Sequence, residues 1–167
     1  MTPMRVVVLG IGNMLLSDEG VGVHAVEALQ KTFMLADDVE VVDGGTTGME
    51  LLPMLHGTDH LIVVDAVRVG KPPATVIRLV DDEVPAFFKT KLSPHQVGLS
   101  DVLAALRFGG GGPGHVVLIG VQPVSLDLSM ELSPAVAACL PEVLDLVVEE
   151  LRAIGRPATR RGVVSAA

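Results

Sequence analysis

Four short apolar runs, rich in valine, isoleucine and leucine, alternate along the chain with segments of helical periodicity. The runs cover residues 5–10, 39–44, 60–67 and 115–123. They are nearly continuous rather than alternating between apolar and polar positions, which is typical of strands buried on both faces. A fifth, weaker run covers residues 74–80, and its internal Arg78 together with the preceding Pro72-Pro73 pair indicates an edge strand.

Helical patterns occupy the intervals between these runs. Apolar residues recur three or four positions apart over residues 18–31, 97–107 and 134–153, and a short helix is expected over residues 47–55. Ser133-Pro134 is a start signal for the last helix, because serine is a favoured cap and proline a favoured first residue. Strands that alternate with helices predict an α/β fold. We expect a single-domain three-layer sandwich, with helices on both faces of a twisted, mostly parallel five-stranded sheet.

The end of the chain shows neither pattern. The last helical segment is followed by Gly155 and Pro157, which end helices, and the residues beyond lack periodicity. We therefore expect the domain to cover residues 1–155 and residues 156–167 to be a disordered tail. The glycine run Gly109–Gly112 is expected to form a flexible surface loop.

Composition excludes several classes of function. The chain of 167 residues carries a net charge of -8, has 2% aromatic residues and contains no Trp or Tyr, all of which argue against a nucleic-acid partner. The single cysteine, Cys139, cannot form an internal disulfide and rules out a cysteine-type zinc site. No apolar run reaches the roughly 20 residues of a membrane span, and no signal-peptide pattern opens the chain. We expect a cytoplasmic protein with no membrane partner.

The first strand and its turn, VVVLGIGNMLLSDEGVG, are similar to a dinucleotide-binding fingerprint. Gly10 and Gly12 fit that motif, but Leu15 stands where its third glycine should be, which would remove the close packing of helix on strand. The adjacent Asp18 and Glu19 would also repel a pyrophosphate. A phosphate-binding P-loop is excluded because no G-K-[ST] sequence follows. The turn is therefore expected to position an acidic side chain rather than to bind a phosphate.

Acidic residues follow three of the predicted strands. Ligands of an open α/β sheet bind outside the carboxyl ends of its strands, where Asp18, Glu19, Asp43 and Asp65 are expected, with His95 at the mouth of the helix over residues 97–107. Carboxylates together with an imidazole suit a divalent metal such as Zn, Ni, Fe or Mn. Any α/β domain also carries acids at its strand ends. The pattern alone therefore does not exclude the alternative that these acids have no catalytic or metal-binding role.

The neighbouring carboxylates Asp18 and Glu19 are expected to have different roles. Since they are adjacent, only one is expected to point at the site, and the other is expected to cap the helix that begins there. The residue pattern alone does not choose between them.

Six motifs, taken together, resemble the maturation endopeptidases of nickel–iron hydrogenases over about residues 5–153. They are GIGNMLLSDEGVG (10–22), DGGTTGMELL (43–52), HLIVVDAV (60–67), SPHQVGLSDVL (93–103), LIGVQP (118–123) and LSPAV (132–136). The resemblance implies a twisted five-stranded sheet with helices on both faces. It also implies an enzyme that removes a C-terminal extension from the precursor of the hydrogenase large subunit after nickel insertion.

The same resemblance assigns roles to residues. It implies that Glu19, Asp65 and His95 form the catalytic and metal-binding site, and it is the resemblance that favours Glu19 over Asp18 as the ligand. The segment from Asp43 through Gly44 and Gly45 to Thr46 is implied to recognise the substrate. The metal is expected to be nickel supplied by the substrate, although other divalent ions such as Cd or Zn can occupy such a site. Whether the hydrolysis is of the aspartic type or metal-assisted stays open, and the alternative function is a non-catalytic, nickel-sensing metallochaperone.

Overall fold

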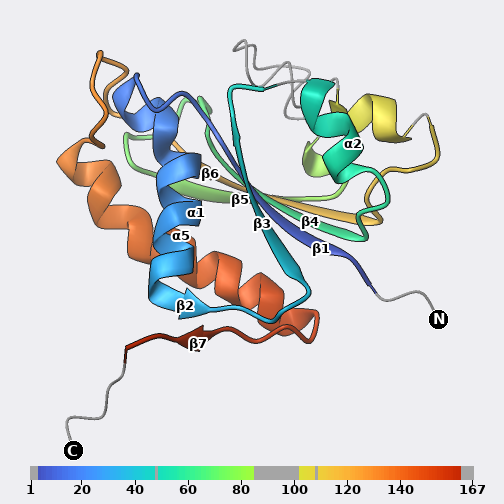
Figure 1. Cartoon of the computed structure of the whole chain (residues 1–167). Coiled ribbons are helices and arrows are strands. Elements are labelled where there is room, and N and C mark those ends of the chain that lie inside the picture. Colours follow the sequence, from blue (N-terminus) through green and yellow to red (C-terminus); the bar gives the residue numbers. More distant parts are fainter. Residues whose placement is uncertain (1–3, 48, 85–101, 108, 163–167) are drawn as a thin grey trace, which may run out of the picture.

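The computed structural model of the chain describes residues 4–47, 49–84, 102–107 and 109–162. Its centre is a twisted five-stranded sheet with the strand order β3-β1-β4-β6-β5 (Figure 1). The strands are β1 (Val6–Ile11), β3 (Val39–Gly45), β4 (His60–Ala66), β5 (Val76–Val80) and β6 (His115–Val121). All pairs are parallel except β5 with β6, so the predicted mostly parallel sheet and the edge position of the fifth run are confirmed.

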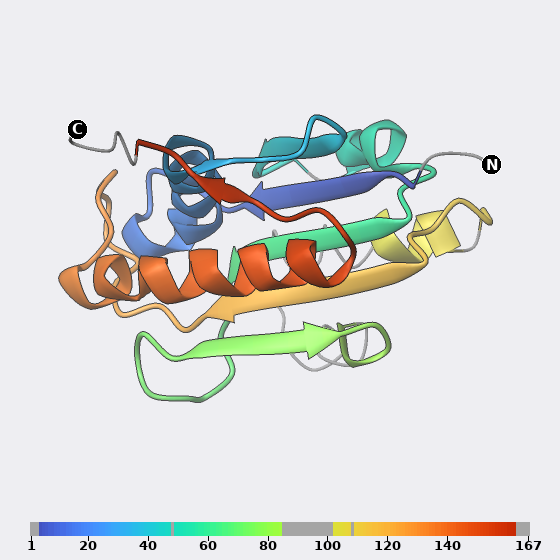
Figure 2. The same ribbon diagram turned by 90° about the horizontal axis from the view of Figure 1, so that it is seen from below.

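Helices cover both faces of this sheet, as predicted (Figures 1 and 2). One face carries α1 (Val21–Thr32) and α5 (Pro134–Ala153). The other carries α2 (Leu52–Leu55), the 3-10 turn η2 (Met49–Leu51) before it, and the helical residues 102–107. The rest of the helix predicted over residues 97–107 lies outside the described residues. None of the described helices is both long and apolar enough to cross a bilayer.

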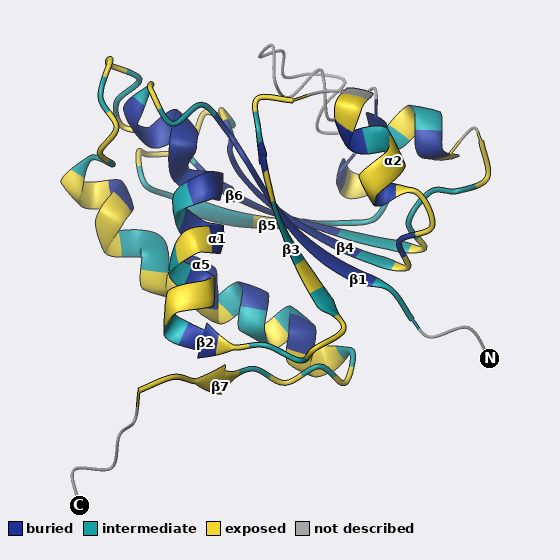
Figure 3. Ribbon diagram, in the orientation of Figure 1, coloured by how far each residue is buried: buried dark blue, intermediate teal, exposed yellow. Residues whose placement is uncertain are grey.

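Two hydrophobic cores, one on each face of the sheet, explain why the strand sequences are continuously apolar. Alternate residues of a strand point to opposite faces, so Val6 and Val8 of β1 join the core under α1 and α5, while Val7 and Leu9 join the other. Figure 3 shows the central strands buried and the outer faces of α1 and α5 exposed. Burial of each such side chain contributes about 1.5–3 kcal/mol, so both faces must be covered.

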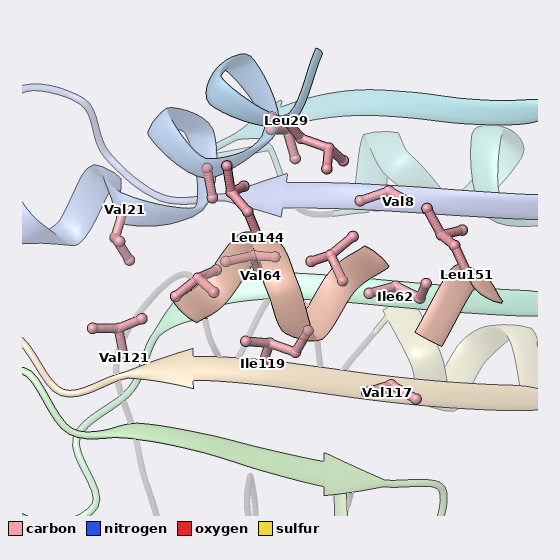
Figure 4. Packing of buried hydrophobic residues seen from close by; sticks show 14 of the residues in the cluster. Val8, Val21, Leu29, Ile62, Val64, Val117, Ile119, Val121, Leu144 and Leu151 are labelled. Carbon is pink, nitrogen blue, oxygen red and sulfur yellow. The ribbon is translucent and has the colours of Figure 1, made fainter. Parts of the chain in front are cut away.

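The long helix α5 closes the larger core. Its Ser133 cap accepts a hydrogen bond from the Val136 N–H, and Pro134 occupies the first turn, as the sequence predicted. Leu144 and Leu151 then join Ile62, Val64 and Ile119 of the two central strands in one core on the same face of the sheet (Figure 4). This packing fixes the position of the N-terminus of α5 relative to the carboxyl ends of β4 and β6.

The glycine run Gly109–Gly112 differs from the flexible loop that the sequence predicted. The N–H groups of Gly109, Gly110 and Gly111 donate to the carbonyls of Ala105, Arg107 and Leu106, which ends the helix over residues 102–107. Gly111 also lies against the ring of His56, where a side chain would collide. The glycines therefore form a tight helix end rather than a loose connection.

The C-terminal segment also differs from the expected tail. Residues 159 and 160 form β7 (Thr159–Arg160), which pairs antiparallel with β2 (Phe33–Met34) directly after α1. Arg156 binds the carboxylate of Asp38, and the Arg161 guanidinium donates to carbonyls at the end of α1. The prediction of disorder was wrong for residues 156–162 because their partners are backbone groups distant in sequence, which no local periodicity reveals. Residues 163–167 lie outside the described part of the chain.

Candidate active site

The candidate residues are placed by the parallel strands, whose carboxyl ends meet at one edge of the sheet, here called the carboxyl edge. Gly10, near the end of β1, is paired with Asp43 of β3 on one side and with Val64 of β4 on the other. Asp65 follows Val64 and lies opposite Gly120 of β6. The structure therefore brings Asp43 and Asp65 to the carboxyl edge, as the sequence predicted. The strand order, which was not predicted, places them on the two sides of the end of β1.

The turn after β1 brings a third acid, Glu19, back to this edge. Glu19 lies in the 3-10 turn η1 (Ser17–Gly20), which packs against β4. Gly12 has a φ of 145°, and a Cβ there would collide with the carbonyl oxygen of Glu19. Only glycine allows this close approach, so Gly12 is the residue that lets the chain fold back.

Close packing of helix on strand is present in spite of the leucine at position 15. Gly22, in the first turn of α1, has its Cα directly against the backbone, and a Cβ there would collide with the carbonyl oxygens of Val64 and Ile11. The expectation that this packing is absent was therefore wrong. Gly22 provides the close packing that the third glycine of a dinucleotide-binding fingerprint provides. It stands later in the sequence, after the acidic turn rather than before it.

Buried polar side chains concentrate at the carboxyl edge. Among the described residues, the buried polar or charged ones are Ser17, Asp18, Glu19, Thr58 and Asp65. All except Thr58 lie in η1 or at the end of β4. Glu19 is 8% exposed and Asp65 is fully buried. Burying carboxylates costs free energy unless charge or hydrogen bonds compensate, so their concentration here marks a site rather than a solvated surface.

Asp18 has a structural role that the sequence left open. Its carboxylate accepts hydrogen bonds from the N–H groups of Val124 and Ser125 at 2.9 Å, from the Ser133 N–H at 2.8 Å and from the Ser133 hydroxyl at 2.8 Å. Burial by itself would raise the pKa of Asp18, but these bonds outweigh it and hold the pKa below its ordinary value. Asp18 therefore joins η1 to the loop after β6 and to the cap of α5.

This arrangement separates the roles of the two adjacent acids. The expected cap is absent, since neither η1 nor α1 has a side-chain cap hydrogen bond. Asp18 instead binds Ser133, the residue that caps α5. Both oxygens of Asp18 are occupied by these bonds. The assignment of Glu19 as the ligand stays a prediction, and it is compatible with this division.

Ser17 begins the acidic turn in a strained conformation. Its φ of 50° lies in the left-handed region, which residues with side chains seldom adopt. The Ser17 N–H donates to the Ser129 carbonyl at 2.7 Å and its hydroxyl donates to the Glu131 carbonyl at 2.9 Å. The loop after β6 thus compensates for strain of order 1–3 kcal/mol and sets the direction of η1.

The segment from Asp43 to Thr46 lies exposed beside this buried site. Asp43 accepts a hydrogen bond from the Gly45 N–H at 3.0 Å, and the Gly45 carbonyl accepts one from the Gly12 N–H at 2.8 Å. Gly44 is buried against β1, whereas Asp43 and Thr46 are exposed. The segment is therefore fixed to the turn after β1 and presents polar side chains to solvent at the carboxyl edge.

His95, the third predicted ligand, lies outside the described residues. Within residues 4–47, 49–84, 102–107 and 109–162, no three histidine, cysteine or acidic side chains come together as a possible metal site. The predicted set of three ligands cannot be formed from the described residues alone. Its metal-binding role stays a prediction.

Sequence reasoning missed two positions that order the loops of this edge. The Gln122 side-chain oxygen accepts a hydrogen bond from the Val69 N–H at 2.9 Å, which fixes the segment after β4 and Asp65. Ser133 was recognised as a helix cap, but not as the partner of Asp18. The motifs containing Gln122 and Ser133 were visible, but their partners stand 53 and 115 residues away in the chain.

Fold and site together define an α/β protein with a buried acidic site at the carboxyl edge of its sheet. A family model described as hydrogenase maturation protease matches residues 23–150. The chain is 49% identical over 162 residues to the hydrogenase 2 maturation protease of Escherichia coli strain K12, covering 96% of this chain and 99% of that protein. It is 46% identical to the hydrogenase expression/formation protein HupD of Rhodobacter capsulatus, covering 98% of this chain and 79% of that protein.

Solved structures that resemble this chain belong to the same family as these sequence relatives. The hydrogenase maturating endopeptidase HybD from E. coli has a TM-score of 0.91 at 50% identity, covering 95% of this chain and 98% of that one. The hydrogenase maturation protease HybD from Thermococcus kodakarensis has a TM-score of 0.73 at 27% identity, covering 89% of this chain and 99% of that one. The chain belongs to the hydrogenase maturation protease family and is a hydrolase. The resemblance seen in the motifs is confirmed.

Proposed function

We propose that this protein is a cytoplasmic endopeptidase that removes the C-terminal extension of the precursor of a nickel–iron hydrogenase large subunit, once nickel has been inserted. Membership of the maturation protease family supports the reaction. The single observation that carries the assignment of the site is the pair of buried carboxylates, Glu19 and Asp65, at the carboxyl edge.

Nickel in this proposal is cargo of the substrate and serves as the recognition element. Glu19 and Asp65 supply carboxylate oxygens, and His95 supplies an imidazole nitrogen. This donor set suits a borderline divalent ion such as nickel, and it would also accept Cd or Zn. Three protein ligands leave positions open for groups of the precursor, so an empty precursor lacks the feature that the site binds.

The chemistry follows from placing the scissile peptide beside the metal. A carbonyl there is polarised, and the oxygen of a water molecule adds to its carbon. Glu19 or Asp65 accepts a proton from that water as a general base, the C–N bond breaks, and the leaving amine takes up a proton. The exposed side chains of Asp43 and Thr46, on a segment fixed beside the site, contact the extension and position it.

Mass measurement of purified, nickel-loaded precursor before and after incubation tests this function. We expect the wild-type protein to remove the C-terminal peptide from loaded precursor and to leave nickel-free precursor intact. An unchanged mass with loaded precursor would instead support a nickel-sensing metallochaperone.

Substitutions then test the site. Glu19→Gln, Asp65→Asn and His95→Ala are each expected to lower the cleavage rate by about 100-fold or more, since each removes a ligand or a base. Glu27→Gln, at an exposed carboxylate on α1, is the matched control and should cleave like wild type. If all three site variants process the precursor normally, the assignment is wrong.

A further inference from the structure

Exposed apolar side chains gather on two loops at the carboxyl edge. Among the described residues, the large hydrophobic side chains that are exposed are Leu15, Met34, Met54, Val124, Leu128 and Met130. Leu15 belongs to the turn after β1, and Val124, Leu128 and Met130 belong to the loop after β6. Leu128 is 83% exposed. We call residues 13–16 and 124–131 the loop platform.

The two parts of the loop platform are held together by backbone bonds. Leu16 and Ser129 form a parallel bridge, the Ser129 N–H donates to the Leu15 carbonyl at 2.9 Å, and the Asp18 N–H donates to the Ser125 carbonyl at 3.2 Å. The Asp18 carboxylate adds its bonds to Val124 and Ser125. The apolar side chains thus stand on an ordered surface, where their contact with water has a lasting cost of roughly 25 cal/mol per Å².

The loop platform is continuous with the candidate active site. Its first part leads into η1, so Leu15 and Leu16 stand four and three positions from Glu19. Both views of the chain place the turn after β1 and the loop after β6 side by side, at the start of α5 (Figures 1 and 2). Exposed apolar surface that adjoins a catalytic site is typical of a docking surface.

Acidic residues border the platform. Asp127 and Glu131 are exposed beside Leu128 and Met130, and the whole chain carries a net charge of -8. A partner suited to this surface presents an apolar patch flanked by basic side chains. A protease of this family necessarily contacts a protein at its active site, so the substrate is the occupant that the position favours.

We propose that the loop platform docks the folded body of the hydrogenase large-subunit precursor, through an apolar patch of the precursor with basic residues at its border. This rests on the proposed function. In this arrangement the platform adds affinity for the folded precursor, while Glu19 and Asp65 contact the metal and the scissile segment, and Asp43 and Thr46 contact the extension. Loss of platform contacts therefore raises KM and leaves kcat unchanged.

The test is cleavage of nickel-loaded precursor by Leu128→Asp, Met130→Asp and the double variant. We expect KM to rise about 10-fold for each single variant and further for the double variant, with kcat within twofold of wild type, because exposed apolar anchors in interfaces contribute about 1–2 kcal/mol each. Met34→Asp is the matched control. Its side chain is 57% exposed on β2, at the far end of α1, and KM should not change.

Each outcome has a defined meaning. Unchanged KM in the double variant, with wild type active, overturns the docking proposal but leaves the proposed function intact. Failure of wild type to cleave contradicts the proposed function instead. If sedimentation shows a wild-type dimer that the double variant abolishes, with KM unchanged, the platform joins two copies of this chain and the proposal is wrong. Thermal unfolding of each variant within about 2 °C of wild type confirms that folding is not the cause, as expected for exposed positions.

Discussion

Asp18 at the carboxyl edge and Asp81 at the opposite, amino edge of the sheet make similar bonds in different surroundings. Asp18 is fully buried and accepts bonds from Val124, Ser125 and Ser133. The Asp81 side chain is 46% exposed and accepts bonds from the Val116 N–H and the His115 ring, each at 2.9 Å. The chemistry of the two carboxylates is alike, and the difference lies in access to water.

The rest of the amino edge follows the pattern of Asp81. Arg5 binds the Glu40 carboxylate and donates from its N–H to Asp59 at 2.7 Å, and both acids are exposed. His60 and His115 lie edge to face at 5.3 Å and border an open hollow beside Asp59. Water can replace any of these partners, whereas nothing replaces the partners of Asp18. Polar contacts therefore contribute strongly to stability at the carboxyl edge and only weakly at the amino edge.

The largest effect that separates the two edges is expected from Asp18→Ala compared with Asp81→Ala. The first leaves three backbone N–H groups and the Ser133 hydroxyl without their acceptor and should lower the free energy of unfolding by about 4 kcal/mol. The second should cost about 1 kcal/mol, since water solvates the freed donors. Urea unfolding at neutral pH measures both. Equal losses in the two variants would show that burial is not what distinguishes the edges.

A smaller difference in stability is expected between alanine substitutions at two glycines, one at each edge. Gly22→Ala places a methyl group against the carbonyls of Val64 and Ile11 at the carboxyl edge and should cost about 2–3 kcal/mol. Gly114→Ala, at the amino edge, meets only the Asp59 carbonyl at an ordinary 3.4 Å and should be nearly neutral. Thermal unfolding compares them. A neutral Gly22→Ala would mean that α1 is free to move away from the sheet.

The smallest effect concerns pH at the amino edge. Burial, followed by the charge of His115, lowers the pKa of His60 below its ordinary 6.5, against the opposite influence of Asp59 and Asp81. The unfolded chain therefore takes up a proton near pH 6.5 that the folded chain does not, and stability falls as pH drops from 6.5 toward the lowered pKa.

Urea unfolding at pH 7.5 and 5.5 measures this contribution, which should be below about 1 kcal/mol after solvent screening. His60→Gln should reduce the loss of stability between the two pH values. If the variant keeps the full dependence on pH, His60 is not its source. The Nδ1 atom of His60 is buried without a hydrogen-bond partner among the described residues, which agrees with a neutral ring.

The strands and helices could be predicted because their signals are local. The five apolar runs gave every strand of the central sheet, and Ser133-Pro134 gave the start of α5. The positions of Asp43 and Asp65 followed from topology, since parallel strands end at one edge. Local pattern also misled, since the glycine run suggested mobility where it forms a helix end.

Features that depend on partners far along the chain could not be predicted. The separate role of Asp18 needed Val124 and Ser133, and the pairing of β7 needed β2, at distances in sequence that periodicity does not span. The acids Asp18 and Glu19 look alike in the sequence because their difference arises only where other segments meet them. The packing role of Gly22 was not predicted, because the nucleotide fingerprint has its third glycine at position 15.

The bonds of Asp18 have a consequence for the order in which the protein becomes active. They connect residues 106 to 115 positions apart, so η1 is fixed only after the chain has been made as far as Ser133. Contacts of such long range form late, since closing a long loop has an entropic cost that early contacts do not offset. During synthesis on the ribosome, the nascent N-terminal segment therefore carries Glu19 and Asp65 without their final geometry. The carboxyl edge therefore reaches its final geometry only after Ser133 has been synthesised.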